Sequence, residues 1–363
     1  MKTIVFYINK IADGGAERAI VNLATELSER GYKALLVTSF RTEDEYAIGE
    51  KVERISLEDE QVIQSSMMRN LSRIKKLRDI CKKRKPEILI SFMAEPIVRS
   101  QIATLGLPIK NVASVRSDPK RVYPGIKGML LGKILLPLVD GCVFQTREAQ
   151  EFFPIRLQKK SRIIYNPVTP EFYEKKRDPI KNKIITCGRL STVKNHKMLI
   201  EAFAKVLEIV PDAQLDIYGI GELRNDLQQI IEQMGLSCKI HLMGNTTNVA
   251  DTLIKADLFV LSSNQEGLPN ALMEAMAVGV PSISTDCPCG GPRELFGDEL
   301  KDMLVPVGDS MALADKMIEL LTNDEQRLRV GRQMIEQAEL FRANVIVDQW
   351  VEYLEYILNK APV

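Results

Sequence analysis

The sequence has few of the residues that usually hold metal ions or disulfides. Only two of its 363 residues are histidine, His196 and His241, which argues against a histidine-rich metal centre. Its six cysteines are scattered, and only Cys287 and Cys289 lie close together, in a spacing too tight for the usual zinc pattern. We therefore expect buried free thiols, and chemistry that rests on Asp, Glu, Arg, Lys and backbone dipoles.

The sequence also lacks a hydrophobic run long enough to cross a bilayer. Its longest apolar stretch, residues 129–139, is 11 residues long and contains Lys133 and Pro137, whereas a spanning helix needs about 20 apolar residues. The first eight residues carry one charge and a short apolar run, which predicts a first strand rather than a signal peptide. We therefore expect a cytoplasmic protein.

The composition is globular, but its charge is unevenly distributed. Hydrophobic residues make up 45% and charged residues 27%, as in ordinary soluble domains, and a length of 363 residues favours two domains over one. The net charge of +1 divides into +10 for residues 1–170 and −9 for residues 171–363. This split favours contact of the first half with a membrane surface or another polyanion.

Strand and helix patterns alternate along the chain. The strands are continuous apolar runs, typical of a parallel sheet covered by helices on both faces; they are residues 3–8, 33–40, 88–92, 111–115, 141–144, 183–187, 214–218, 240–242, 258–261 and 281–285. A charged stretch with several prolines, residues 166–182, is the expected linker. We therefore predict an α/β fold with Rossmann-like domains over residues 1–170 and 171–340, and a helical end over about residues 325–358.

Gly14 and Gly15 lie in the loop between the first predicted strand and a helix over residues 16–30. Glycine allows close backbone approach, and the free N–H groups at a helix amino terminus favour a phosphate. A turn that only caps the helix explains the same two glycines, so both interpretations stay open.

Residues 187–196 place Gly188, Arg189 and Lys194 between a strand and a helix that begins near residue 197. Arginine offers a planar fork of donors and lysine a compact charge, a combination suited to a diphosphate leaving group. Two solvated loop cations are the alternative.

A second motif, SSNQEGLPNALMEA, covers residues 262–275. Glu266 lies in a loop, and Glu274 lies in a helix that is predicted to begin near Asn270, so the free N–H groups of that helix face the same pocket as the loop. A buried Glu274 would need a polar partner such as a ribose diol. An exposed glutamate on the polar side of the helix is the alternative.

Together these motifs resemble those of the family 4 retaining glycosyltransferases, and the resemblance covers nearly the whole chain. Its motifs are Gly14-Gly15, Gly188-Arg189 with Lys194, Gly219 and Gly221, and the Glu266-x7-Glu274 spacing. The resemblance implies a GT-B architecture, in which two Rossmann-like domains face a central cleft. The first domain would bind the acceptor and the second the donor nucleotide, and the C-terminal helix, about residues 340–363, would pack back on the first.

By that resemblance each motif has an expected role. Arg189 and Lys194 would hold the donor diphosphate, Glu274 the ribose hydroxyls, and Glu266 would face the transferred sugar. The other expected binding residues act mainly through their backbone: Gly14, Gly15, Gly188, Gly244, Asn245, Gly267, Leu268, Pro269 and Asn270. The nucleoside diphosphate leaves and the acceptor attacks from the same face, so the anomeric configuration is kept. We expect no metal or other cofactor, because the sequence has no Asp-x-Asp motif and two cations neutralise the diphosphate.

The first domain departs from the family pattern at one position. Many relatives carry a histidine near the sugar, whereas the corresponding residues 115–119 read VRSDP. We expect Arg116 to take the place of that histidine. A salt bridge of Arg116 to Asp118 or Glu95 is the alternative.

The chain is also similar to enzymes that extend bacterial surface polysaccharides or lipid-linked oligosaccharides. Residues 69–85 contain nine Lys or Arg and one Asp, which fits a basic helix on the inner membrane surface. Its predicted apolar stripe is Leu71, Ile74, Leu77 and Cys81. A second patch, residues 120–133 with Tyr123, Met129, Leu130 and Leu131, would join it in docking near a polyprenyl-diphosphate acceptor. A solvated basic face over a buried stripe is the alternative.

The resemblance thus predicts a metal-independent hexosyltransferase, peripheral on the cytoplasmic membrane face, that moves a hexose or N-acetylhexosamine from a UDP-sugar to a lipid-linked glycan. A GT-B nucleotide-sugar epimerase, which acts on the donor alone, is one alternative. A non-catalytic partner subunit is another, although it would tolerate losses among the motif residues and none is lost. Nucleic-acid binding is disfavoured because no aromatic residues are interleaved with the basic run.

Overall fold

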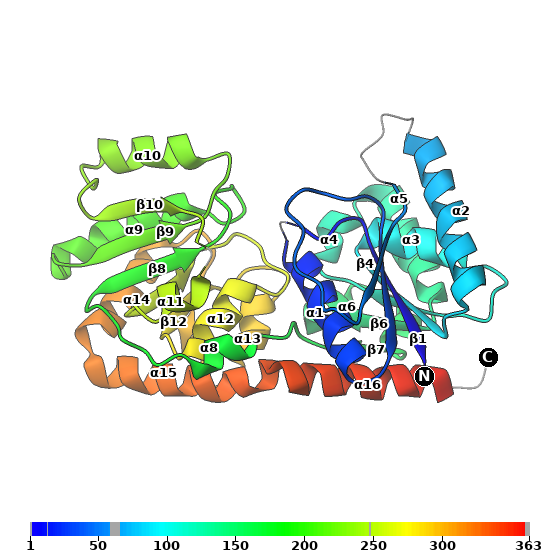
Figure 1. Ribbon diagram of the computed structural model, residues 1–363. Coiled ribbons are helices and arrows are strands. Elements are labelled where there is room, and N and C mark those ends of the chain that lie inside the picture. Colours follow the sequence, from blue (N-terminus) through cyan, green and yellow to red (C-terminus); the bar gives the residue numbers. More distant parts are fainter. Residues whose placement is uncertain (1, 13, 59–65, 247, 360–363) are drawn as a thin grey trace. The chain divides into compact units, whose positions relative to one another are not determined.

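The computed structural model describes residues 2–12, 14–58, 66–246 and 248–359. These residues form two compact units, each built on a parallel sheet with helices on both of its faces (Figure 1). Unit 1 comprises Met1–Pro167 and Asn344–Val363, and unit 2 comprises Val168–Ala343. The first crossing between the units, at residues 167–168, falls within the charged stretch that the sequence indicates as a linker.

Unit 1 contains a seven-stranded parallel sheet. Its order is β3 (Glu53–Ser56), β2 (Lys33–Thr38), β1 (Thr3–Ile8), β4 (Ile88–Phe92), β5 (Lys110–Ser114), β6 (Gly141–Phe144) and β7 (Ser161–Ile163). The helices and helical turns of the unit are α1 (Gly15–Glu29), α2 (Ser66–Arg84), α3 (Ala94–Ala103), α4 (Pro119–Val122), α5 (Gly125–Leu130), η1 (Leu131–Leu135), η2 (Leu136–Leu138), α6 (Arg147–Glu151), α7 (Ile155–Gln158) and α16 (Ala343–Asn359).

Strand β1 shows why this sheet is buried on both faces. Its side chains point alternately to opposite sides, so Phe6 joins the core cluster that includes α1 and α16, while Val5 and Tyr7 join the cluster that includes α2. Because both faces of β1 are covered, apolar residues are required at successive positions along this strand.

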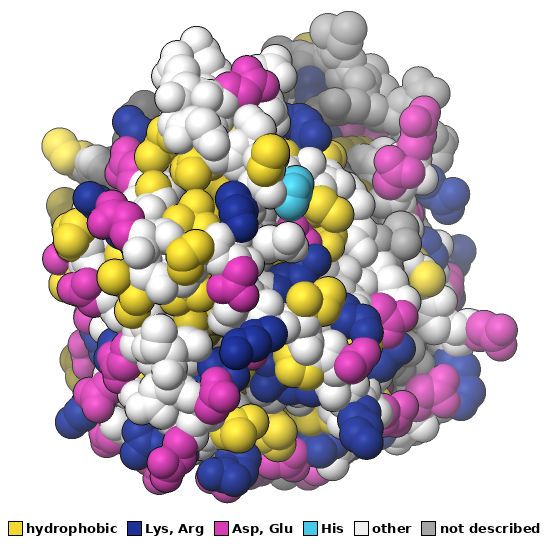
Figure 2. All heavy atoms as spheres, turned by 90° about the vertical axis from the view of Figure 1, so that its left-hand side faces the viewer, with side chains coloured by type: hydrophobic (Ala, Val, Ile, Leu, Met, Phe, Trp, Pro, Cys, Tyr) yellow, Lys and Arg dark blue, Asp and Glu magenta, His cyan; other side chains and the backbone are white. Residues whose placement is uncertain are grey.

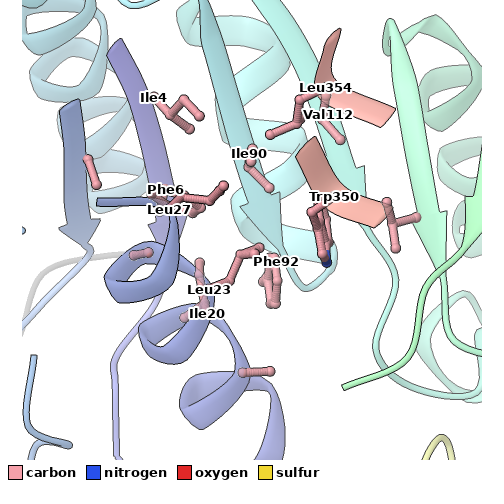
Figure 3. Packing of buried hydrophobic residues seen from close by; sticks show 14 of the residues in the cluster. Ile4, Phe6, Ile20, Leu23, Leu27, Ile90, Phe92, Val112, Trp350 and Leu354 are labelled. Atoms are coloured by element: carbon pink, nitrogen blue, oxygen red, sulfur yellow. The ribbon is translucent and has the colours of Figure 1, made fainter. Parts of the chain in front are cut away.

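The C-terminal helix α16 packs on the sheet of unit 1. Figure 3 shows Trp350 and Leu354 of this helix near Ile90 and Val112 of the sheet, and Trp350 is buried. The Tyr353 hydroxyl accepts a hydrogen bond from Cys142 N at 2.7 Å and lies 2.5 Å from Lys160 O. The helix thus closes the core of this unit, although its sequence is far from the strands that it covers.

Helix α2 buries only part of its predicted apolar stripe. Leu77 and Cys81 are buried in the core, which favours the alternative of a basic face over a buried stripe at these positions, whereas Leu71 is 61% exposed. Arg73 instead faces inward, where it forms a buried ion pair with Glu58. Because Leu71 and Arg73 are two residues apart on a helix, they point in nearly opposite directions, and Leu71 faces outward.

Unit 2 contains a six-stranded parallel sheet. Its order is β10 (Ile240–Gly244), β9 (Gln214–Tyr218), β8 (Lys183–Cys187), β11 (Leu258–Leu261), β12 (Ser282–Thr285) and β13 (Leu304–Val305). Its helices and helical turns are α8 (Pro170–Glu174), α9 (His196–Ile209), α10 (Arg224–Gln233), α11 (Val249–Leu253), α12 (Asn270–Val278), α13 (Gly291–Phe296), η3 (Lys301–Met303), α14 (Ser310–Thr322), α15 (Asp324–Ala338) and η4 (Glu339–Phe341).

The two sheets confirm the predicted α/β fold with two Rossmann-like halves. The helical end of the chain, predicted over about residues 325–358, is divided into α15, η4 and α16, and the division coincides with the passage from unit 2 to unit 1 at residues 343–344. Among the described residues, no helix combines the length and the apolar character that a membrane span requires.

Candidate active site

Three loops of unit 2 meet at the carboxyl ends of neighbouring strands. They follow β8, β11 and β12 and cover residues 188–195, 262–269 and 286–290. The strand order runs outward in opposite directions from β8 and β11, and ligands of open α/β sheets bind outside the strand ends at such a reversal. The three loops therefore border the expected ligand site of this unit.

Backbone hydrogen bonds hold these loops together. Asn264 N donates to Val193 O at 2.7 Å, which joins the loops after β11 and β8. Glu266 N donates to Pro288 O at 2.7 Å, and Cys289 N donates back to Glu266 O at 2.8 Å. Two hydrogen bonds therefore tie the backbone of Glu266 to the loop after β12.

The structure brings Lys194 and Glu266 into direct contact. Lys194 Nζ lies 2.5 Å from Glu266 Oε1, and the hydroxyl of Ser263 donates to the same oxygen at 2.6 Å. The two charged side chains are 21% and 12% exposed, and Ser263 is buried. Lys194 is thus part of a mostly buried ion pair, which excludes the alternative that it is a solvated loop cation.

Glycines allow the loops to approach this closely. A Cβ at Gly219 would lie 1.9 Å from Gly188 O, and a Cβ at Gly291 would lie 1.8 Å from Gly267 O. Both distances are far shorter than van der Waals contact, so only glycine fits at either position. Gly188 itself lies beneath the side chain of Lys194, and the next residue, Arg189, is exposed.

Helix α12 begins at Asn270, as predicted, directly after this loop. Its N-cap residue, Pro269, supplies no side-chain hydrogen bond to the first turn. Gly267 is half-buried, whereas Leu268 and Pro269 are buried. The first turn of α12 is therefore not capped by the side chain of its N-cap residue, and it lies at the same edge of the sheet as Glu266.

Glu274 lies one turn into α12 and is 7% exposed, which overturns the alternative of an exposed glutamate. Cys187 is the last residue of β8. Burial raises the pKa of its thiol to about 12, and the negative charge of Glu274 contributes to this rise. The carboxyl group of Glu274 thus lies within electrostatic reach of the end of β8.

Gly244 and Asn245 lie farther along the same edge. Gly244 ends β10, and its carbonyl accepts a hydrogen bond from Gly219 N at 2.8 Å. Asn245 follows and is exposed. Because β9 separates β10 from β8, these residues are two strands away from the Lys194 loop.

Sequence reasoning missed two residues of this site. Ser263 holds Glu266, and its signal was only a hydroxyl three residues earlier in the same loop. His196, the first residue of α9, is 3% exposed, and its Nδ1 atom has no hydrogen-bond partner. Burial, with the nearby charge of Lys194, lowers the pKa of His196 to about 4, so the ring is neutral at neutral pH.

In unit 1, Gly14 and Gly15 occupy the predicted position between β1 and α1. Gly14 is the N-cap of α1, its backbone is extended at a φ of −152°, and it supplies no side-chain cap. The strand order of this sheet reverses between β1 and β4, so the two glycines also lie at a reversal point. The preceding residue, Asp13, is outside the described residues.

Arg116 follows β5 and is 8% exposed. Its guanidinium donates to Ser114 Oγ and Asn166 Oδ1, each at 2.6 Å, and stacks on the ring of Phe92 at 4.2 Å. Desolvation lowers the pKa of Arg116 to about 9. Its side chain is therefore a buried cation that is held by neutral groups.

Neither of the salt bridges considered for Arg116 is formed. The carboxylate of Glu95 pairs with Arg99 at 2.7 Å. The carboxylate of Asp118 caps α4 by accepting from Lys120 N at 2.9 Å. Short-range pairing along the sequence therefore does not explain why an arginine is buried at this position.

No metal centre is visible in the described part of the chain, where no group of three or more His, Cys, Asp or Glu side chains is placed to hold a metal ion. What unit 2 offers instead is a mostly buried acid beside a cation, with the amino termini of α9 and α12 at the same edge. This combination can bind an anion and also present a carboxylate to a neighbouring hydroxyl.

Two family models match the chain and together span most of it. The model described as "Glycosyl transferases group 1" matches residues 169–337, and "Glycosyltransferase Family 4" matches residues 13–172. The chain belongs to the family 4-like glycosyltransferases. The two matches meet where unit 1 passes into unit 2.

Relatives of this glycosyltransferase extend over its whole length. A Campylobacter jejuni protein named GalNAc-alpha-(1->4)-GalNAc-alpha-(1->3)-diNAcBac-PP-undecaprenol alpha-1,4-N-acetyl-D-galactosaminyltransferase is 27% identical over 99% of this chain and 100% of that protein. The N-acetyl-alpha-D-glucosaminyl L-malate synthase of Bacillus anthracis is 25% identical over 93% of this chain and 92% of the relative.

Solved structures show the same GT-B fold. HepE from Anabaena, determined in complex with UDP and glucose, superposes with a TM-score of 0.79 at 17% identity and covers 98% of this chain and 100% of its own. Sucrose-phosphate synthase from Thermosynechococcus elongatus gives a TM-score of 0.82 at 15% identity over 98% and 99%. The predicted fold class of this glycosyltransferase is thereby confirmed.

Proposed function

We propose that this glycosyltransferase moves a hexose or N-acetylhexosamine from a UDP-sugar to a lipid-linked glycan with retention of anomeric configuration, in the assembly of a bacterial surface polysaccharide or glycan. The observation that carries the proposal is the Lys194–Glu266 pair at the reversal point of the second sheet. It supports the proposal because a cation suited to a phosphate and a carboxylate suited to sugar hydroxyls lie side by side.

Each residue of this site has a defined role in the proposed reaction. Lys194 and Arg189, with the first N–H groups of α12, bind the diphosphate and stabilise its charge as the bond from the sugar C1 to the phosphate oxygen breaks. Glu274 binds the ribose, and Gly244 with Asn245 reads the base. Glu266 faces the sugar through Oε2, because Lys194 and Ser263 both bind Oε1.

The electrons of the broken bond leave with the diphosphate, the acceptor hydroxyl attacks C1 from the face that the diphosphate has left, and the proton of that hydroxyl passes to an oxygen of the departing diphosphate. In this proposal Lys194 and Arg189, and no metal ion, stabilise the negative charge that develops on the diphosphate. Unit 1 binds the acceptor, and Arg116 supplies a cation to it. A buried guanidinium that is not neutralised by a carboxylate retains its attraction for an anionic or hydroxyl-rich ligand.

The lipid-linked acceptor is proposed from two sources. The Campylobacter jejuni relative is named for an undecaprenol-diphosphate-linked substrate. The sequence of unit 1, including α16, carries 30 Lys and Arg against 22 Asp and Glu, a formal charge of +8, which suits an anionic membrane surface. We accordingly place the enzyme on the cytoplasmic face of a membrane.

A thermal-shift panel tests the donor site. We expect UDP and UDP-sugars to raise the melting temperature more than GDP or ADP, equally with and without added divalent metal, because a ligand that binds only the folded state stabilises it. A shift that appears only with metal would contradict metal independence. No shift with any nucleotide would favour a non-catalytic subunit.

The variant Lys194→Ala sharpens that test. We expect it to bind UDP about 10- to 100-fold more weakly, since hydrogen bonds to charged groups contribute about 1.5–3 kcal/mol. Lys205→Ala, an exposed lysine on α9, is the control and should bind as the wild type does. Equal affinity in both variants would remove Lys194 from the diphosphate site.

Product analysis tests the reaction itself. With UDP-sugar and a lipid-linked acceptor analogue, we expect an α-linked product from an α-linked donor, as read by proton NMR of the anomeric signal. An inverted signal would refute retention. Conversion of the sugar without any acceptor would instead identify an epimerase.

A further inference from the structure

Unit 1 exposes an unusual concentration of large hydrophobic side chains along one helical segment. We call this set the apolar ridge. It consists of Ile126, Met129, Leu130, Ile134, Leu135 and Leu138, which are 37–75% exposed. The segment comprises α5, η1 and η2. Exposed apolar patches on this scale mark protein or membrane interaction surfaces.

The ridge belongs to a helical segment whose polarity is inverted. Gly128 packs on the backbone of Tyr123, where an added Cβ would lie 2.2 Å from the Tyr123 carbonyl carbon. Gly132 faces the rings of Tyr123 and Phe153. An ordinary surface helix turns its large apolar side chains to the core. Here the glycines face the core and most of the large side chains face out, although Leu136 is buried.

The exposed apolar surface continues onto α3. The side chain of Gln101 donates to Leu135 O at 3.1 Å, so the ridge lies against this helix. On α3 and just beyond its end, Ile102 and Leu105 are 45% and 67% exposed. Arg78 of α2 donates to Leu105 O at 2.8 Å. The ridge, the end of α3 and the basic helix α2 are thus consecutive neighbours.

The sequence of the ridge segment itself carries charge of one sign. Residues 120–139 contain four Lys or Arg and no Asp or Glu. On α2, Lys75, Lys82 and Lys83 are exposed, whereas Lys76, although exposed, donates through Nζ to Leu57 O at 2.6 Å. A second copy of the chain docked on the same surface would bring these cations against one another, at a cost in Coulomb energy. An anionic layer with an apolar interior is complementary to both features.

We propose that the apolar ridge inserts into the outer part of a bilayer that carries anionic lipid, while the lysines of α2 contact its headgroups. Interfacial helices of this type bury their apolar face at the boundary between headgroups and acyl chains. The inference rests on the lipid-linked acceptor proposed above, because such docking brings unit 1 to the surface where that acceptor is held. The sequence predicted docking through the stripe of α2 joined by the second patch, residues 120–133. The structure exposes Met129 and Leu130 of that patch, buries Tyr123 and extends the exposed set to Leu138.

Vesicle co-sedimentation with the full chain tests the ridge. The probes are phosphatidylcholine vesicles with and without phosphatidylglycerol. We expect Leu130→Ser with Ile134→Ser to weaken binding about tenfold or more, because burial of two large aliphatic side chains is lost. The matched control is Ile209→Ser with Met311→Ser, two exposed positions of unit 2 that are 60% and 53% exposed, and it should bind like the wild type.

Replacement of Lys75, Lys82 and Lys83 by Ser separates the electrostatic part. This variant should lose the preference for vesicles with phosphatidylglycerol and, like the ridge variant, should keep its melting temperature and its UDP binding. Binding that is unchanged by the ridge substitutions would overturn the proposal. So would a wild-type dimer, detected by light scattering, that the ridge substitutions dissociate without any vesicle binding.

The vesicle-binding experiment can be interpreted whether or not the proposed sugar transfer occurs. Transfer to a soluble acceptor should persist in the ridge variant, because the substitutions lie on the surface. If the wild type binds vesicles through the ridge but transfers no sugar, the proposed function fails and the docking surface stands. If it transfers sugar and never binds vesicles, the docking proposal fails alone.

Discussion

The two units share a parallel sheet with a reversal in strand order, but they use the carboxyl ends of their strands differently. In unit 2 a cation and an acid pair directly, Lys194 with Glu266, within loops that hydrogen bonds tie together. In unit 1 the buried cation Arg116 is held by Ser114, Asn166 and the ring of Phe92. One site is internally neutralised, while the other keeps an uncompensated charge.

The two units also differ in net charge and in their exposed side chains. The sequence of unit 1 has a formal charge of +8 and that of unit 2 a charge of −7. Figure 2 views the molecule from the side of unit 2 and shows Lys and Arg side chains interspersed with Asp and Glu. Unit 1 instead presents a ridge of exposed apolar residues beside exposed lysines. We infer that unit 2 is preorganised for a small ligand and unit 1 for a larger anionic partner.

The largest effect should follow from removing the acid in unit 2. We expect Glu266→Gln to lower the rate of sugar transfer about 100- to 1,000-fold, as loss of one electrostatic group in an active site typically does, while UDP still binds. Steady-state transfer assays and calorimetric titration with UDP measure the two quantities. The exposed Glu232→Gln on α10 is the control. Full turnover by Glu266→Gln would remove its role.

The neutral histidine of unit 2 provides a pH test. The pKa of His196 is about 4 in the folded chain, against an ordinary value of 6.5, so between these values the unfolded chain binds a proton that the folded chain does not. Stability therefore falls as the pH is lowered from 6.5 to 4, by up to about 3 kcal/mol. Chemical denaturation should show that the unfolding free energy of His196→Leu falls less over this pH range than that of the wild type, by about the same amount. Parallel curves for both proteins would contradict the assignment.

The sequence predicted the central strands well because each is a continuous apolar run. The predicted residues 258–261 coincide with β11, Leu258–Leu261. The strand β3, Glu53–Ser56, was not predicted, because its residues are only partly buried at the edge of the sheet and form no apolar run. Hydrophobicity alone identifies a strand only where both faces are covered.

The sites show a similar limit. The sequence placed Lys194 and Glu266 in loops after strands, and adjacency of β8 and β11 brings them together. The partners of Arg116 could not be foreseen, because Asn166 is 50 residues away. The outward direction of the apolar ridge likewise depends on where Gly128 and Gly132 pack. Contacts of this kind are fixed by the tertiary structure and leave no local pattern.

A smaller effect is expected at the anchor of α16 in unit 1. The variant Tyr353→Phe leaves the buried N–H of Cys142 without its acceptor, which should cost about 1–3 kcal/mol of unfolding free energy. UDP affinity should not change, since the proposed nucleotide site lies in unit 2. Tyr356→Phe, on the same helix and 42% exposed, should change stability by less than about 0.5 kcal/mol. Equal losses in both variants would show that the hydroxyl of Tyr353 is not the anchor.

The smallest change in stability is expected where the difference between the units is sharpest. Burial of a cation costs desolvation free energy, and without a carboxylate nearby little Coulomb energy offsets that cost. We therefore expect Arg116→Gln to change the unfolding free energy by about 1 kcal/mol or less, or even to raise it. Arg73→Gln is the contrast, because it leaves the buried carboxylate of Glu58 without its ion-pair partner. This variant should lose about 3–5 kcal/mol of unfolding free energy. Transfer to the acceptor should nevertheless fall about tenfold in Arg116→Gln, with UDP affinity unchanged. A stability loss as large as that of Arg73→Gln, with normal transfer, would make Arg116 a structural residue and remove the distinction drawn between the two sites.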